Sequence, residues 1–303
     1  MSWLVAARFI DRIGKGIRGA PRDALVADLA PPHLRGASFG LRQSLDTVGA
    51  FLGPMLAIGL MWLTANSFQT VFWVAVVPAF LAVGLLLFAV HEPERPVGLP
   101  KLRSPFSLAE LKRLGPAYWW VVGIAVVFSM ARFSEAFLIL RAQAVGMPVM
   151  LVPMVLVLMN IAYALAAYPA GALSDRSNRI TILGVGFGLL VAADLVLAFT
   201  KGLSGVAIGV ALWGLHMGFT QGLLATLVAD TAPPELRGTA YGFFNLFSGL
   251  ALLVASLLAG ALWDKLGPQS TFFGGAVFAA IALAGLTATR HIAPTVGHAP
   301  KSG

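Results

Sequence analysis

The sequence has no cysteine among its 303 residues, and only 11% of the residues are charged. The absence of cysteine excludes a disulfide scaffold, a thiolate zinc site and a cysteine nucleophile. Soluble domains carry about a quarter charged residues, so this shortage of charge indicates a chain whose solvent is largely lipid. Hydrophobic residues make up 58% of the chain, which supports the same interpretation.

Basic residues outnumber acidic ones, giving a formal net charge of +8, but they do not gather in one patch. They fall in short loops and inside one helix, which argues against nucleic-acid binding. The histidines are scattered, without the spacing of metal ligands or of a nucleophile–base set. We therefore expect no enzyme, no metal site and no cofactor. The histidines are His33, His91, His216, His291 and His298.

Long apolar stretches recur at the length that a membrane-spanning helix needs, about 20 residues. Strand-like alternation is absent, and in lipid only helices or closed barrels satisfy every backbone polar group. The sequence therefore predicts an all-α, polytopic helical membrane protein. The spans predicted from hydropathy are residues 37–63, 69–90, 117–140, 148–173, 180–200, 202–229, 238–263 and 266–289.

The loops between these spans differ in basic content. Eleven basic residues lie on one side, and three lie on the other. Because basic loops stay in the cytoplasm, we expect the larger set and the C-terminus there, in a multi-pass protein of the cell membrane. The larger set is Arg35, Arg95, Lys101, Arg103, Lys112, Arg113, Arg176, Arg179, Arg237, Arg290 and Lys301, and the smaller set is Arg141, Lys201 and Lys265.

A duplicated unit relates the two ends of the chain. Residues 25–40 and 227–242 are identical at eleven of sixteen positions, at a constant offset of 202. Such self-similarity indicates an internal repeat. Six helices separate the copies, so two repeats make twelve helices. The same offset aligns residues 4–29 with 206–231 and predicts a ninth span.

This repeat also predicts the domain organisation. Residues 1–90 would be the remnant of an N-terminal six-helix bundle, containing helices four to six, and residues 117–303 a C-terminal six-helix bundle with its tail. Residues 91–116, with five basic residues and a helix-start signal at Ser107-x-x-Glu110, would be a cytoplasmic linker. We expect the reading frame upstream of Met1 to encode the three helices without a counterpart here.

Three motifs resemble those of the major facilitator superfamily of secondary transporters. They are Leu4-x3-Arg8 with Gly14, Gly40-x8-Gly49-x3-Gly53-Pro54, and Gly171-x3-Asp175-Arg176-x2-Arg179. The first resembles the family's fourth-helix pattern, the second is similar to the fifth-helix signature of proton-coupled exporters, and the third resembles the gating loop between helices eight and nine. The resemblance implies a twelve-helix fold that transports a small molecule by alternating access.

A basic stripe runs along one face of the predicted helix 4–29, because its members are three or four residues apart. Each charge costs about 2.5–3.5 kcal/mol at a helix centre in lipid, so this helix needs protein or water beside it. We predict that the stripe lines the substrate or proton pathway. The alternative is ion pairing that holds a gate shut. The charged residues are Arg8, Asp11, Arg12, Lys15, Arg18 and Arg22.

Two carboxylates inside predicted spans, Asp46 and Glu135, are candidates for carrying a proton. Low dielectric pushes a carboxylate toward its neutral form, which makes it a possible proton carrier. Asp46 stands four residues after Arg42 and Glu135 three after Arg132, so ion pairing on the same helix is the structural alternative. Asp194 stands alone in an apolar span, and we interpret it as a helix cap or a polar contact to a neighbouring helix.

Two further groups are candidates for conformational change. Gly49 and Gly53 would let helices approach closely, and Pro54 would permit a bend, so we predict a hinge or a packing site. We also predict a six-residue loop at residues 174–179, which contains Asp175. Its carboxylate could occupy the positive N-terminal end of a neighbouring helix and hold one conformation closed, with Arg176 and Arg179 beside it.

The leading hypothesis is alternating-access transport of a small solute, coupled to protons in an efflux antiport across a lipid bilayer. Facilitated uptake of a sugar or organic anion is the first alternative. A membrane sensor or scaffold that transports nothing is the second.

Overall fold

The computed structural model describes residues 18–64, 67–89 and 108–288, and all regular structure in these residues is helical. Proline marks several helix starts, at Pro116, Pro153 and Pro268, because the first helical position needs no N–H donor. Residues 18–29 are helical, and the helices that follow are η1 (Pro32–Leu34), α2 (Arg35–Leu63), α3 (Phe68–Ala89), α4 (Leu108–Arg113), α5 (Pro116–Ala131), α6 (Ala136–Ala144), η2 (Val149–Leu151), α7 (Pro153–Arg176), α8 (Arg179–Phe199), α9 (Leu203–Thr231), η3 (Pro234–Leu236), α10 (Arg237–Leu266) and α11 (Pro268–Ala288).

The predicted all-α, polytopic class is confirmed. In the described part of the chain, seven helical segments are long and apolar enough to cross a bilayer, and α3 contains a shorter apolar stretch, Gln69–Leu85. These segments coincide with the eight spans predicted from hydropathy. Of the ninth predicted span, residues 4–29, only 18–29 are described. The short helix predicted after Ser107 is α4.

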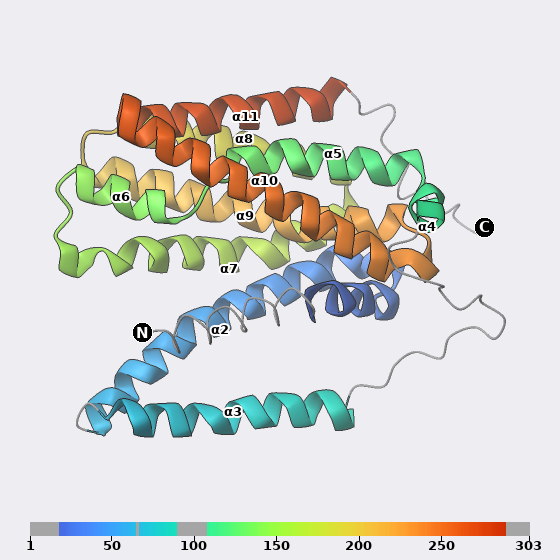
Figure 1. Ribbon diagram of the computed structural model, residues 1–303, viewed down its shortest axis with the longest axis horizontal. Coiled ribbons are helices and arrows are strands. Elements are labelled where there is room, and N and C mark those ends of the chain that lie inside the picture. Colours follow the sequence, from blue (N-terminus) through green and yellow to red (C-terminus); the bar gives the residue numbers. More distant parts are fainter. Residues whose placement is uncertain (1–17, 65–66, 90–107, 289–303) are drawn as a thin grey trace.

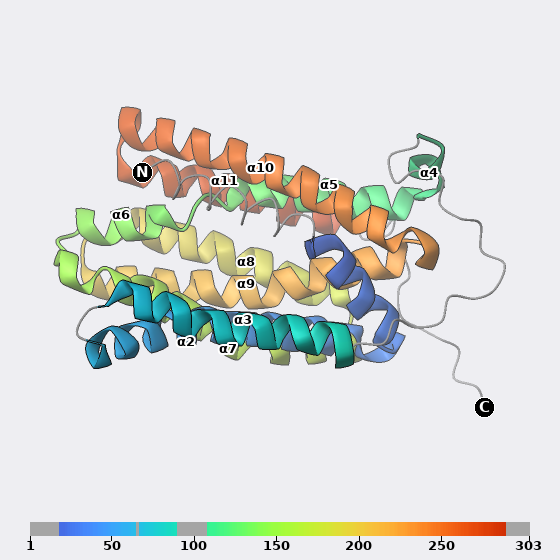
Figure 2. The same ribbon diagram turned by 60° about the horizontal axis from the view of Figure 1, so that its bottom comes forward.

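Helices α5 to α11 form what we call the main bundle, in which they lie side by side around an apolar core (Figures 1 and 2). Helix α8 packs against α9 and α11, and α9 also packs against α7. The middle of the core is aromatic, since the rings of Phe128 and Phe187 stack with centroids 3.9 Å apart. Trp213 is fully buried beside them in the same core.

The first turns of α2 cross the last turns of α7, and glycine lets the two helices approach very closely at this crossing. A Cβ atom added to Gly171 would overlap the carbonyl oxygen of Gly36, and one added to Gly40 would overlap the carbonyl oxygen of Ala167. Backbone therefore lies directly on backbone at this crossing, without side chains between the helices.

Further along its length, α2 leaves the main bundle. Figure 1 shows it running obliquely away from α7 toward Leu63, with α3 still farther out. A Cβ atom on Gly49 or Gly53 would have no neighbour within 4 Å, so no described helix packs closely on the side of α2 toward which these Cβ positions point. The helix is continuous through Pro54. The predicted hinge at these three residues stays a prediction.

Two details of the predicted spans are wrong. The span 117–140 is not one helix, because α5 ends at Ala131 and α6 begins at Ala136. We call residues 132–135 the break. Its backbone is stabilised by side chains instead of a helical ladder: the N–H of Ser134 donates to Ser256 Oγ on α10 (3.1 Å), and the N–H of Ala136 donates to Ser134 Oγ (3.3 Å).

The predicted loop at 174–179 is also shorter than expected. Helix α7 continues to Arg176, and α8 begins at Arg179. Asn178 caps α8, with its side-chain oxygen accepting from the N–H groups of Ile180 (2.9 Å) and Thr181 (3.4 Å). The Asn178 cap starts α8 directly after α7 ends. Since α7 continues to Arg176, Asp175 lies in the last turn of α7.

Candidate functional site

The two copies of the repeat meet at one end of the molecule and exchange ion pairs. Arg35 of the first copy binds Asp230 of the second, with 2.9 Å between Nη1 and Oδ1, and Arg237 of the second binds Asp28 of the first. Asp28 and Asp230 are equivalent positions at the offset of 202, as are Arg35 and Arg237. The pairing is therefore reciprocal between the copies. We call this end of the molecule the charged end.

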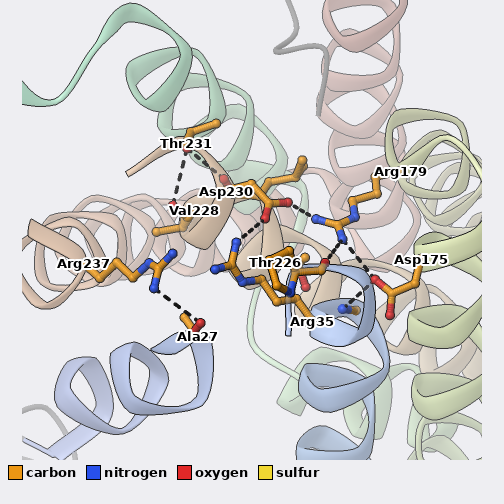
Figure 3. Close-up of polar contacts among 12 residues, drawn as sticks. Ala27, Arg35, Asp175, Arg179, Thr226, Val228, Asp230, Thr231 and Arg237 are labelled. Atoms are coloured by element: carbon orange, nitrogen blue, oxygen red, sulfur yellow. Dashed lines mark hydrogen bonds and ion pairs between the residues drawn. The ribbon is translucent and has the colours of Figure 1, made fainter. Parts of the chain in front are cut away.

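Asp230 binds a second guanidinium, that of Arg179 on α8 (Figure 3). The three side chains are almost buried, with 5% of Asp230, 9% of Arg179 and 12% of Arg35 exposed. Arg179 also donates to the carbonyl oxygen of Pro32 (3.2 Å) and to Asp175 Oδ1 (3.0 Å). One carboxylate and one arginine thus connect α9, α8, α7 and the turn before α2.

Asp175 occupies the N-terminal end of α2. Its two carboxylate oxygens accept hydrogen bonds from the N–H groups of Gly36 (2.9 Å) and Ala37 (2.8 Å). A negative charge at a helix N-terminus is stabilised by the unsatisfied N–H groups and by the helix dipole. The motif at 171–179 predicted such a contact from its spacing, and the geometry places the carboxylate there. Its role in gating stays a prediction.

Replacing Asp175 by asparagine should slow transport while leaving substrate affinity nearly unchanged. The amide can still accept one hydrogen bond, but it loses the charge that favours the helix N-terminus. That interaction contributes about 0.3–2 kcal/mol, so turnover should fall between about twofold and thirtyfold. Initial transport rates and equilibrium binding would be compared with those of Asp264→Asn, the same change at an exposed position at the end of α10. A large loss of affinity at normal turnover would remove Asp175 from the gate.

A second group of charges lies between α2 and the helix that precedes it. Asp46 pairs with Arg42 (3.2 Å), as its spacing predicted, and with Arg22 (3.4 Å). Arg22 and Arg42 also reach Asp23, at 3.3 and 3.4 Å. Two predicted pathway residues, Arg22 and Asp46, therefore lie together, and each is about half exposed.

The break in the main bundle opens a pocket of about 500 Å³. Arg132 and Glu135 lie in its wall without an ion pair or side-chain hydrogen bond within the described residues, so the predicted pair is not formed there. Its lining combines these charges with aromatic, aliphatic and hydroxyl groups. The lining residues are Arg132, Phe133, Ser134, Glu135, Trp213, Gly249, Leu252, Leu253 and Ser256.

The remaining predicted site residues do not join these groups. Arg18 and Arg176 are exposed. The rest of the basic stripe lies outside the described residues, namely Arg8, Asp11, Arg12 and Lys15.

Sequence reasoning missed four site residues, Asp28, Arg35, Asp230 and Arg237. The repeat contained all of them at matched positions, and an acidic and a basic residue at equal spacing in both copies was the signal. It also missed a polar bridge between α2 and the main bundle, in which Gln221 accepts from Tyr163 (3.0 Å) and Gln43 (3.5 Å).

Comparison with known proteins gives concordant results. A sequence model described as Major Facilitator Superfamily matches residues 1–256. An uncharacterised MFS-type transporter of Methanocaldococcus jannaschii is 34% identical over 92% of this chain and 71% of its own length. An uncharacterised protein of Mycobacterium tuberculosis is 30% identical over 86% of this chain, which spans 65% of that relative. Among solved structures, the human organic anion transporter MFSD10 superposes with a TM-score of 0.65, at 20% identity, over 88% of this chain and 67% of its own.

Proposed function

Since this chain belongs to the major facilitator superfamily, a family of membrane transporters, we propose that it moves a small solute by alternating access and exports it in exchange for protons. The observation that carries the proposal is the asymmetry of α2. Ion pairs and glycine contacts bind its first turns to the main bundle, whereas its far end is separate (Figure 1). Because α2 and the main bundle are held together at one end and separate at the other, they can rock about a site near the middle of the membrane.

The orientation of the molecule in the membrane follows from the distribution of basic residues. Basic loops face the cytoplasm, and the charged end carries Arg35, Arg113, Arg176, Arg179 and Arg237. We therefore assign the charged end to the cytoplasmic side of the cell membrane, together with the C-terminus. The conformation is then closed toward the cytoplasm and open outward. Release of the charged end would open the inward-facing state.

The pocket at the break is the proposed substrate site. Trp213, Leu252 and Leu253 offer an apolar and aromatic surface, while Arg132 and Glu135 offer charges of both signs. Broken membrane helices commonly form such sites, because their free backbone and polar side chains are tolerated only beside a cavity. The solute that fits is small and amphipathic, with an aromatic body and a polar group.

Coupling depends on which charge binds the solute. A solute that binds Glu135 competes with a proton for the same carboxylate, and this mutual exclusion produces antiport. A solute that binds Arg132 instead does not compete with a proton, so its transport is not coupled to protons in this way. The second candidate function is therefore uptake of an organic anion, favoured by the unpaired state of Arg132 within the described residues. The human protein MFSD10, on which this chain superposes, is an organic anion transporter.

Proteoliposomes with an acidic interior would separate the two functions. Ethidium carries a permanent positive charge, so a pH gradient alone does not trap it, and 3-phenylpropionate supplies the aromatic anion. Antiport predicts ethidium accumulation that collapses with a protonophore and is lost in Glu135→Gln. Protein-free liposomes give the background. Accumulation that ignores the gradient would reject antiport, and Arg132-dependent entry of 3-phenylpropionate would support anion uptake.

A further inference from the structure

A buried carboxyl group lies behind the proposed substrate pocket and takes no part in the contacts described above. Asp194, in the middle of α8, is completely buried. Both of its carboxylate oxygens are buried without a hydrogen-bond partner in the described parts of the chain, and no ion pair forms with it there. The interpretation of Asp194 as a polar contact to a neighbouring helix is therefore wrong for the residues that the structure describes.

The space around this carboxyl group exists because α11 has glycine opposite it. A Cβ atom on Gly275 would lie 2.5 Å from Asp194 Oδ2 and 2.8 Å from Cε1 of Phe133. Asp194 and the ring of Phe133 thus meet at the same point on α11. Phe133 belongs to the break, and it also lines the pocket.

The ring of Phe133 reaches both the surroundings of the carboxyl group and the pocket, and we call this ring and the rings packed on it the aromatic wall. The rings of Phe133 and Trp213 pack with centroids 5.1 Å apart, and both residues line the pocket. Phe272 of α11 packs on Phe133 at 5.5 Å. Any rearrangement of the break that moves Phe133 would therefore expose Asp194 to the pocket.

The charged and titratable neighbours of α8 do not neutralise Asp194. Arg141 of α6 directs its guanidinium to the carbonyl oxygens of Leu197 (2.8 Å), Ala198 (3.3 Å) and Thr200 (2.6 Å) at the end of α8. On α9, His216 is buried with its ring edge-on to Trp213, at 5.2 Å.

The other elements packed against α8 provide no ion-pair partner for Asp194 among the described residues. Arg132 lies in the break and lines the pocket. Helix α5 contributes Tyr118, whose hydroxyl donates to the carbonyl oxygen of Ala240 (2.8 Å). Helix α7 has its charges at the far end, at Asp175 and Arg176. Helix α11 has no ionisable residue.

We propose that Asp194 is a proton-binding site of the transporter, loaded in the conformation described here and unloaded when Phe133 moves aside. An ionised carboxylate without a partner in such a site is destabilised by several kcal/mol, whereas the protonated form is neutral. On unloading, the O–H bond of Asp194 breaks and its proton passes to pocket water that is open to the cytoplasm. The carboxylate then takes a proton from water on the outer side, which restores the loaded state. The inference rests on the proposed proton coupling and adds a second group to it: Asp194 stores the proton behind the pocket, and Glu135 in the pocket wall exchanges it with the solute.

Infrared difference spectroscopy of the protein in lipid nanodiscs tests the protonation state without a transported solute. At pH 7, wild type minus Asp194→Asn should contain the C=O stretching band of a protonated carboxylic acid. Wild type minus Asp264→Asn, in which an exposed acid is removed, should contain carboxylate bands instead. Asparagine is a neutral isostere of the protonated acid, so the variant should remain folded, as size-exclusion chromatography would verify. Carboxylate bands in the Asp194 difference spectrum would overturn the proposal.

Ethidium transport in the acid-loaded proteoliposomes tests the coupling. In wild type, the initial rate with a pH gradient should exceed the rate without one, and in Asp194→Asn the ratio of the two rates should fall to about one. A wild-type ratio of one would reject proton antiport itself, and the infrared result would then decide the proton site alone. A gradient-dependent wild type whose dependence survives in Asp194→Asn would reject Asp194 as the coupling site and leave antiport standing.

Discussion

Replacing Gly171 by valine is expected to open the charged end and to lower turnover by about 5- to 150-fold. The added side chain would overlap the carbonyl oxygen of Gly36, a backbone atom that cannot rotate away. Overpacking of this kind costs about 1–3 kcal/mol. In the proposed alternating access the crossing separates when the charged end opens, so the penalty falls on the closed state and reduces its population about 5- to 150-fold relative to the open one.

Spin labels at the charged end would measure this change directly. The chain has no native cysteine, so cysteines introduced at the exposed residues His33 and Ser177 would be the only labelled sites. The distance between the labels should lengthen and broaden in Gly171→Val. The matched control is Gly188→Val in α8, where an added Cβ meets nothing within 4 Å. An unchanged distance distribution in Gly171→Val would show that the crossing does not govern closure.

The sequence was informative wherever the signal was local. Apolar length placed the eight spans, because a bilayer imposes it on each helix separately. The contact of Asp175 with a helix N-terminus is not local, because that helix is α2, and it was expected from the resemblance of the motif at 171–179 to the family's gating loop. The ion pair of Asp46 with Arg42 followed from an interval of four residues on one helix.

Features that depend on distant partners were not predictable in the same way. The break after Ala131 is held by Ser256, more than a hundred residues away, and hydropathy does not register such a contact. The isolation of Asp194 depends on a glycine of α11 and a phenylalanine of the break. Of the proposed basic stripe, only Arg18 and Arg22 are described, and Arg22 is occupied by ion pairs, as the alternative interpretation expected.

Charge reversal should distinguish the two reciprocal ion pairs of the charged end. The single changes Asp28→Arg and Arg237→Asp should each impair transport, and the double variant should recover most of it, because Asp28 pairs with Arg237 and the exchanged charges can pair again. Asp28 is also 36% exposed, so its environment tolerates a larger cation.

The exchange of Arg35 and Asp230 should fail to recover transport, although the two positions are equivalent in the repeat. Asp230 neutralises Arg179 as well as Arg35, and only 5% of its side chain is exposed. Arg35→Asp with Asp230→Arg would place a second guanidinium against Arg179 in a buried site. Breaking a buried pair costs about 3–5 kcal/mol, which corresponds to more than a hundredfold loss of the closed state.

A double-mutant cycle on transport rate, repeated with the His33 and Ser177 labels, would measure both couplings. We expect a favourable coupling of about 1 kcal/mol or more between residues 28 and 237, and no recovery between residues 35 and 230. Adding Arg179→Gln to the second exchange should restore part of the closure, since it removes the new repulsion without placing a second carboxylate beside Asp175. Equal recovery of the two exchanges would mean that Arg179 does not share Asp230. The asymmetry arises because Asp175 and Arg179 act on one side of the repeat only, where Asp175 binds the first turn of α2 and Arg179 binds Pro32 and Asp230.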